Sequence, residues 1–137
     1  SYAQLEMVAS DTSYEGRALA FEGLGRSALR MGRLDDARSA FQRALQLDGN
    51  LFIAALELSL LEFDQKDYLS ARRYYQSYLT IVEFLQLPHT PRALFAGIQI
   101  KGYFQNEELV ENFTLVLSTL YPSSPEYQQL QRLSDAN

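Results

Sequence analysis

Apolar residues return every three or four positions along this chain, in stretches separated by short polar turns. Such spacing predicts amphipathic helices that each bury one face. The predicted helices cover residues 2–10, 15–31, 34–47, 51–65, 67–86, 91–104, 106–120 and 125–133. Gly32 and Gly49 lie in the turns between them, where both are free to adopt left-handed backbone geometry. Ser124 and Pro125 supply a cap and a first residue for the last helix.

A second periodicity relates the helices to one another. Three residues of one predicted helix return as similar residues 34 positions later: Ala37, Phe41 and Ala44 become Ala71, Tyr75 and Tyr78. A 34-residue period is typical of the tetratricopeptide repeat, a helix–turn–helix unit. The sequence therefore predicts an all-α tetratricopeptide-repeat solenoid of antiparallel hairpins, wound as a right-handed superhelix. Its predicted packing residues are Phe21, Leu24, Gly25, Ala28, Gly32, Ala37, Phe41, Ala44, Leu58, Ala71, Tyr75, Tyr78, Gly97 and Phe113.

The repeats divide the chain, which we expect to form one domain. The segments are a truncated repeat (1–14), two repeats (15–50 and 51–86), a divergent repeat (87–121) and a C-terminal capping helix with a tail (122–137). The divergent repeat is longer by four residues, which we place around Pro88 and Pro91 because proline interrupts helices. Residues 2–10 look like a second helix without its first, so we expect a piece of a longer array.

Composition and motifs argue against chemistry in this chain. A formal net charge of −5 and a pI near 4.8 disfavour nucleic acid, and the chain has no cysteine for a disulfide or a thiolate metal site. The single histidine, His89, is expected to be a solvated loop residue. Glu107 and Glu111, like Asp35–Asp36, are expected to be solvated helix surface. With no phosphate loop or nucleophile motif, we predict no enzyme activity, cofactor, metal or small-molecule substrate.

An apolar stripe in the predicted helix 51–65 is the best candidate for a binding surface. Ile53, Leu56, Leu60 and Phe63 follow helical spacing on a different face from the repeat's packing residues. The full candidate groove comprises Glu22, Arg26, Arg30, Ile53, Leu56, Leu60, Phe63, Leu94 and Ile98. A ligand with an apolar centre and an acidic end would fit it. Internal packing and self-association are the alternative explanations of the stripe.

Several segments together resemble one family of bacterial proteins. They are Leu24–Asp48, Ala54–Leu58, Asp67–Leu79, Ala96–Ile98 and the ending Leu120–Tyr127. In this order they are similar to the type IV pilus biogenesis and stability proteins PilF/PilW. The usual glycine of the third turn is replaced around Phe104–Gln105.

The resemblance implies a function and a location. Members of the family are expected in the periplasm, often as lipoproteins on the inner face of the outer membrane. They act as pilotins or scaffolds that help the pilus secretin to reach that membrane and assemble, without a cofactor. The expected partner is therefore the secretin, and membrane contact would come only from a lipid anchor outside this chain. The alternative is a generic adaptor that binds a peptide or a chaperone in its concave groove.

Overall fold

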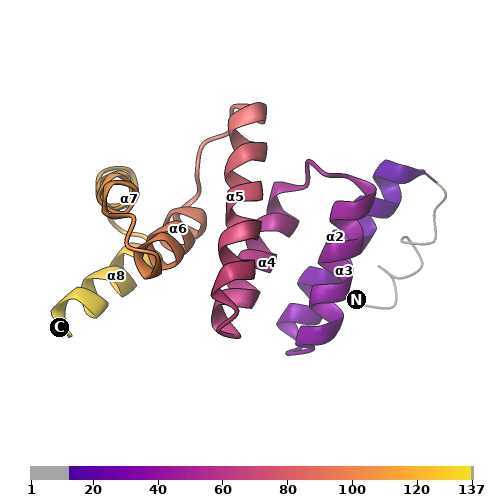
Figure 1. Ribbon diagram of the computed structural model, residues 1–137, viewed down its shortest axis with the longest axis horizontal. Coiled ribbons are helices and arrows are strands. Elements are labelled where there is room, and N and C mark those ends of the chain that lie inside the picture. Colours follow the sequence, from indigo (N-terminus) through magenta and orange to yellow (C-terminus); the bar gives the residue numbers. More distant parts are fainter. Residues whose placement is uncertain (1–12, 137) are drawn as a thin grey trace. The chain divides into compact units, whose positions relative to one another are not determined.

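The computed structural model describes residues 13–136, and all regular secondary structure in that range is helical (Figure 1). The helices are α2 (Tyr14–Arg30), α3 (Leu34–Leu47), α4 (Phe52–Asp64), α5 (Tyr68–Leu85), α6 (Pro91–Tyr103), α7 (Glu107–Leu120) and α8 (Pro125–Asp135). Each begins and ends within two residues of its predicted bounds. The helix predicted at residues 2–10 lies outside the described residues.

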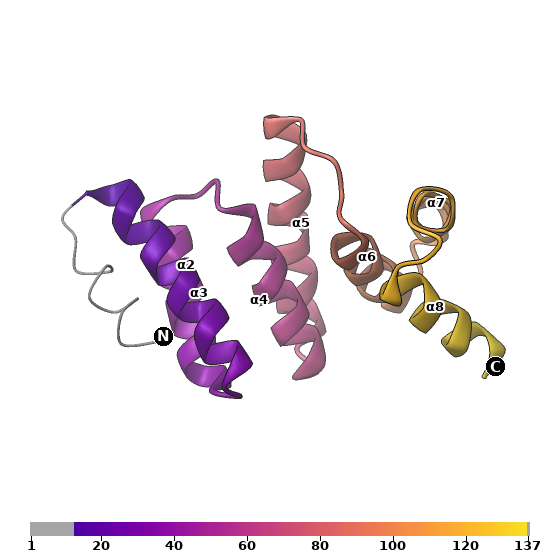
Figure 2. The same ribbon diagram turned by 180° about the vertical axis from the view of Figure 1, so that it is seen from behind.

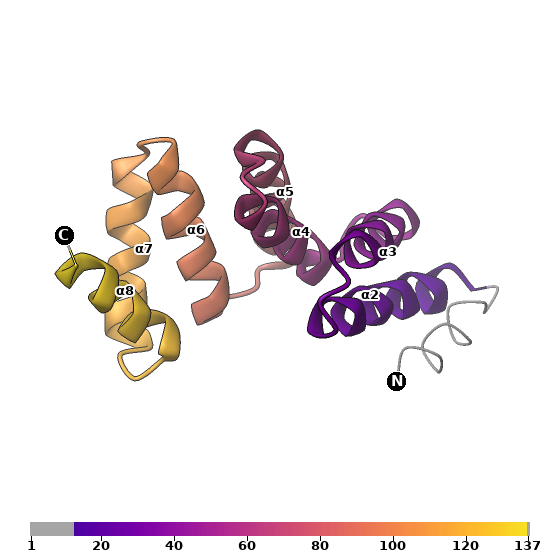
Figure 3. The same ribbon diagram turned by 90° about the horizontal axis from the view of Figure 1, so that it is seen from below.

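The contacts divide the chain into two compact units, one ending at Phe84 and the other beginning at Leu85. In the first unit, α2 packs along α3, and α3 and α2 both contact α4 (Figure 3). Helix α5 follows α4 after a short turn and lies beside it (Figure 2). In the second unit, α6 packs against α7 and α8.

The first unit is organised around the ring of Phe41, which is completely buried. A Cβ atom added to Gly25 of α2 would lie only 2.7 Å from carbon atoms of this ring. The absence of a side chain at Gly25 therefore lets α3 approach α2 at this point. Ala28 and Leu58 belong to the same buried cluster, so the contact joins α2, α3 and α4.

Three of the turns between helices share one backbone conformation. The left-handed residues are Gly32 (φ 74°), Lys66 (φ 66°) and Gln105 (φ 62°). A hydrogen bond from a backbone N–H to the carbonyl five residues earlier closes each turn, joining Arg33 to Ala28, Asp67 to Glu62 and Asn106 to Lys101, all at 2.9 Å. This is the Schellman arrangement that ends many helices. The replaced glycine of the third turn thus leaves the turn's geometry unchanged.

Gly32 uses the left-handed geometry that is open to glycine, but Gly49 does not, because its φ is not positive. The turn between α3 and α4 is instead organised by Asp48. Its carboxylate oxygen Oδ1 accepts a hydrogen bond from the backbone N–H of Asn50 at 2.9 Å. Such a side-chain bond shapes the turn without a left-handed residue.

The second unit has its own small apolar core. Leu94, Ile98 and Leu117 are buried, with Phe113 and Tyr127 among the residues packed against them. Helix α8 begins at the predicted cap, since the Ser124 hydroxyl oxygen accepts from the backbone N–H of Tyr127 at 3.1 Å.

We expect Gly25→Ala to lower the free energy of unfolding by about 1–3 kcal/mol through overpacking against Phe41. Alanine is the better helix former, so the loss must come from the close contact. Urea denaturation measures it. The same substitution should cost less when Phe41→Leu is already present, because the two residues are in contact. An equal cost in both backgrounds would contradict this account.

The shared turn geometry gives a second prediction, for Lys66→Gly. Because an L-residue is strained in this conformation, the change should raise the free energy of unfolding by roughly 0.5–1 kcal/mol. Gly32→Ala should do the opposite, by about 1 kcal/mol. Nothing lies within 4 Å of the Cβ it would add, so only backbone strain contributes. Thermal unfolding of the two variants tests both predictions. Melting temperatures that both rise, or both fall, relative to wild type would contradict the strain at these positions.

Candidate partner surface

Helices α2 and α4 of the first unit carry most of the predicted groove. Arg26 and Arg30, one helical turn apart on α2, are exposed. On α4, Ile53, Leu60 and Phe63 are half-buried. Since α2 and α4 contact each other, the basic and apolar side chains lie on neighbouring helices of one unit. They are the members of the predicted set that remain accessible in part, and their role as a groove stays a prediction.

The spacing predicts that Glu22 lies in the groove, but the structure places it between helices. Its side chain is buried, and its carboxylate oxygen Oε2 accepts a hydrogen bond from the backbone N–H of Ala54 at 3.2 Å. Ala54 lies in the first turn of α4, where backbone N–H groups have no partner within the helix. The cap residue, Leu51, has an apolar side chain that makes no hydrogen bond to these N–H groups. Glu22 therefore caps α4 from another helix.

Three apolar members of the predicted groove are also buried rather than open. Leu56 is 6% exposed, and Leu94 and Ile98 are 0% and 7% exposed. Leu94 and Ile98 pack against Leu117 in the second unit, where they form its core. Helical spacing alone could not separate these positions from surface ones, because α4 and α6 bury residues on nearly every side.

An ion pair that the sequence analysis missed joins α3 to α4. The Arg38 guanidinium donates to Glu62 Oε1 from Nη2 at 2.9 Å and from Nε at 3.1 Å, and Nη1 donates to Asp35 at 2.8 Å. The hydrogen bond to Glu62 is the main cause that raises the pKa of Arg38 above its usual value. Glu62 is thereby held inside the hairpin stack and is not offered to a partner.

His89 is not the solvated loop residue that we expected. It is half-buried, and its ring centroid lies 5.1 Å from that of Phe113. Burial lowers the pKa of its imidazole, which favours the neutral form. The hydroxyl of Tyr121 donates to the His89 carbonyl oxygen at 3.0 Å, so the loop is held at the end of α7 within the second unit. Among residues 13–136, no group of three or more potential ligands could hold a metal ion.

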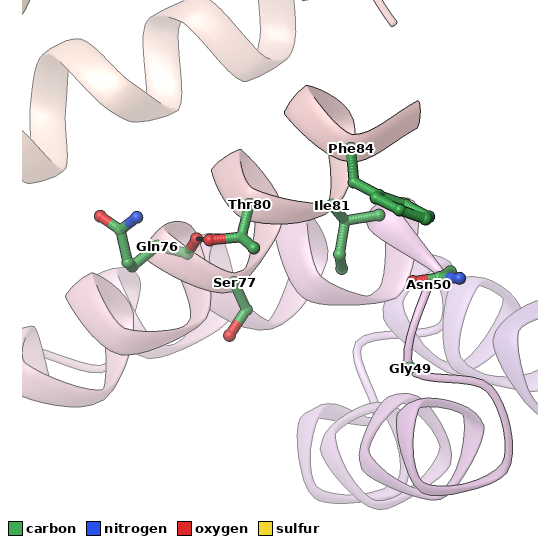
Figure 4. A pocket seen from close by; sticks show the side chains of 7 residues that line it. All are labelled: Gly49, Asn50, Gln76, Ser77, Thr80, Ile81 and Phe84. Carbon is green, nitrogen blue, oxygen red and sulfur yellow. Dashed lines mark hydrogen bonds between the residues drawn. The ribbon is translucent and has the colours of Figure 1, made fainter. Parts of the chain in front are cut away.

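A hollow that the sequence analysis did not find lies in the first unit (Figure 4). It has a volume of about 540 Å³ and is formed by the Gly49–Asn50 turn and one face of α5. The α5 residues are Gln76, Ser77, Thr80, Ile81 and Phe84. Their helical spacing was visible in the sequence, but the turn that completes the hollow comes from a different hairpin.

Comparisons with known proteins agree with the fold and show which proteins the chain is similar to. The model of the tetratricopeptide repeat matches residues 22–84. The type IV pilus assembly protein PilF of Pseudomonas aeruginosa is 31% identical over 131 residues, which is 96% of this chain and 50% of PilF. A solved structure of P. aeruginosa PilF superposes with a TM-score of 0.85 at 31% identity, covering 96% of this chain and 57% of that one. The chain is thus similar to PilF over nearly all of its own length, and residues 22–84 form tetratricopeptide repeats.

The relation to PilF concerns part of the relative only, because this chain spans about half of the length of PilF. A crystal structure of PilW, a type IV pilus biogenesis factor, has the same fold, with a TM-score of 0.72 at 20% identity over 95% of this chain and 57% of PilW. None of the helices in residues 13–136 is both long and apolar enough to cross a membrane.

The buried cap predicts a pH dependence of stability. Burial is the largest cause that raises the pKa of Glu22 above 4.5, so the folded state holds this proton more tightly than the unfolded state. Its contribution to stability is therefore complete below 4.5 and is lost as the pH rises through the folded pKa. Glu22→Gln keeps an oxygen acceptor for Ala54 without the charge. Relative to wild type, it should gain stability between about pH 4 and about pH 7.

Urea denaturation across this pH range measures the difference, with Glu22→Ala as the comparison. The alanine variant loses the cap and should be less stable than the glutamine variant by about 0.5–2 kcal/mol. A difference between wild type and Glu22→Gln that stays constant with pH would contradict the burial of a titrating carboxyl.

Proposed function

We propose that this chain is a protein-interaction scaffold in type IV pilus biogenesis that assists the outer-membrane localisation and assembly of the pilus secretin. The observation that carries the proposal is the similarity to PilF, which extends over nearly the whole chain in sequence and in structure. A scaffold needs no reacting groups, and we assign the chain neither a catalytic role nor a cofactor.

The chemistry of the α2/α4 face supports binding to a protein segment. We use this name for Arg26, Arg30, Ile53, Leu60 and Phe63. The two guanidinium groups are suited to carboxylates, while the half-buried apolar side chains can accept an apolar anchor. A secretin segment with an apolar centre and an acidic end would be complementary to both parts.

The proposal includes a location. A scaffold for the secretin would act in the periplasm at the inner face of the outer membrane, held there by an anchor outside this chain. The second candidate is a generic adaptor for a peptide or chaperone elsewhere, since repeats of this kind offer similar faces to unrelated ligands. The residues that precede this segment in the full protein distinguish the two. A lipoprotein signal favours the pilus scaffold, and an initiator methionine leading directly into repeats favours the adaptor.

A pull-down from a detergent extract of piliated cells tests the proposal, with the secretin detected by immunoblot. Wild type should retain the secretin, and Leu60→Glu should not, because it places a charge on the apolar part of the α2/α4 face. Circular dichroism and thermal unfolding must first show that the variant is folded. Arg26→Glu with Arg30→Glu is a second variant at exposed positions, and it should weaken retention as well.

Leu69→Glu is the matched control. Leu69 is 66% exposed on α5, so the same chemical change occurs in the same unit but off the α2/α4 face. It should retain the secretin like wild type. Retention by all variants would mean that the face is only packing surface. Failure of the wild-type chain, when full-length protein succeeds, would place the secretin contact outside this segment.

A further inference from the structure

The hollow beside α5 has a lining whose chemistry suits one class of ligand. None of its described lining residues is ionisable. Two amide side chains, two hydroxyl groups and one aromatic ring surround it, belonging to Asn50, Gln76, Ser77, Thr80 and Phe84. Its volume of about 540 Å³ falls within the range of small-ligand sites. Of the lining residues only Ile81 is buried, so the hollow is open to solvent, and it offers a ligand hydrogen bonds and an aromatic face rather than an ion pair.

The two hydroxyl groups use their hydrogen atoms within α5. The Ser77 hydroxyl donates to the Arg73 carbonyl oxygen at 3.2 Å, and the Thr80 hydroxyl donates to the Gln76 carbonyl oxygen at 3.0 Å. Each hydroxyl has a single hydrogen, so what remains for a ligand is lone pairs. A ligand must therefore bring N–H or O–H donors to this side.

The two amide side chains complement the hydroxyl groups. Asn50 and Gln76 can each donate and accept hydrogen bonds. They lie at opposite ends of the set of lining residues drawn in Figure 4. The turn that carries Asn50 is fixed by the hydrogen bond of its backbone N–H to Asp48. The amide N–H groups of these two side chains could donate hydrogen bonds to acceptor atoms of a ligand.

Phe84 supplies an apolar surface at the rim. Its side chain is 73% exposed, and in Figure 4 it lies at the same end as Asn50. Ile81, only 7% exposed, forms apolar lining beside it. The face of an aromatic ring carries partial negative charge, which attracts the weakly positive C–H groups of a flat, apolar ligand face.

We propose that this hollow binds a neutral saccharide that carries acetamido groups. The sugar ring would present its C–H face to Phe84. The acetamido N–H would donate to Ser77 or Thr80, its carbonyl oxygen would accept from an amide side chain, and its methyl group would contact Ile81. An uncharged lining with both donors and acceptors, together with one exposed ring, matches each part of such a ligand. The site is independent of the proposed scaffold function.

Titration of the ¹⁵N-labelled chain with N,N′-diacetylchitobiose, followed by amide chemical shifts, tests this proposal. Wild type should show saturable shifts at residues 49–50 and 76–84. Cellobiose, which lacks acetamido groups, should bind more weakly. Phe84→Ala should weaken binding about fivefold to tenfold. Because Phe84 is largely exposed, its truncation should leave the fold intact.

Thr80→Val and Leu69→Ala complete the design. Thr80→Val keeps the shape of the side chain but removes the acceptor oxygen, so binding should weaken. Leu69 lies on the same helix outside the hollow and is similarly exposed, so Leu69→Ala should bind like wild type.

Three results would overturn the proposal. The first is an absence of shifts at these amides at tens of millimolar disaccharide, a range in which weak sites with a Kd of about 1 mM saturate. The second is equal binding by Phe84→Ala, or equal binding of cellobiose. The third is a response of these same amides to an uncharged, end-capped peptide rich in serine and threonine but not to the sugar, which would assign the hollow to a protein ligand.

Discussion

The contact between the Phe41 ring and Gly25 is the constraint on which the first unit depends. A completely buried aromatic ring on α3 needs a glycine opposite it, because even a methyl group on α2 would lie within 2.7 Å of ring carbons. The close approach of α2 and α3 brings Ala28 and Ala37 into one cluster with Leu58 of α4. The close packing of α2 on α3, against which α4 is buried, therefore depends on one missing side chain.

Because α4 is buried, its charged side chains and its first backbone N–H groups need partners, and neighbouring helices supply them. The helix contains two glutamates with less than a tenth of their surface exposed, Glu57 and Glu62. Arg38 from α3 neutralises Glu62, while Glu22 from α2 satisfies a backbone N–H at the start of α4. The carboxylates of Glu62 and Glu22 therefore point into the helix stack and contribute little to its surface. Arg26 and Arg30 are left at the surface, where they give the face its positive charge.

The sequence predicted what depends on local periodicity. Helix bounds and the left-handed Gly32 follow from spacing and from glycine's conformational freedom, and Tyr75 and Tyr78 are buried at the positions given by the repeat. It could not predict contacts made across helices. Glu22 reads as a surface residue until Ala54 of the next hairpin is placed beside it.

The same limit explains the other differences. Nothing in the local sequence of Lys66 or Gln105 indicates a left-handed residue; the shared turn imposes it. His89 lies between prolines in a loop, yet Phe113 from another helix covers it. The hollow combines one face of α5 with a turn from an earlier hairpin, and no periodicity within one helix reveals such a combination.

Hydrogen–deuterium exchange of the purified chain, with and without the purified pilus secretin of the same organism, tests the central claim most directly. The secretin should slow exchange in α2 and α4 around Arg26, Arg30 and Leu60. Helix α5 around Leu69 should exchange at the same rate in both samples. Protection restricted to α6–α8, or protection nowhere along the chain, would contradict the assignment of the α2/α4 face as the partner surface.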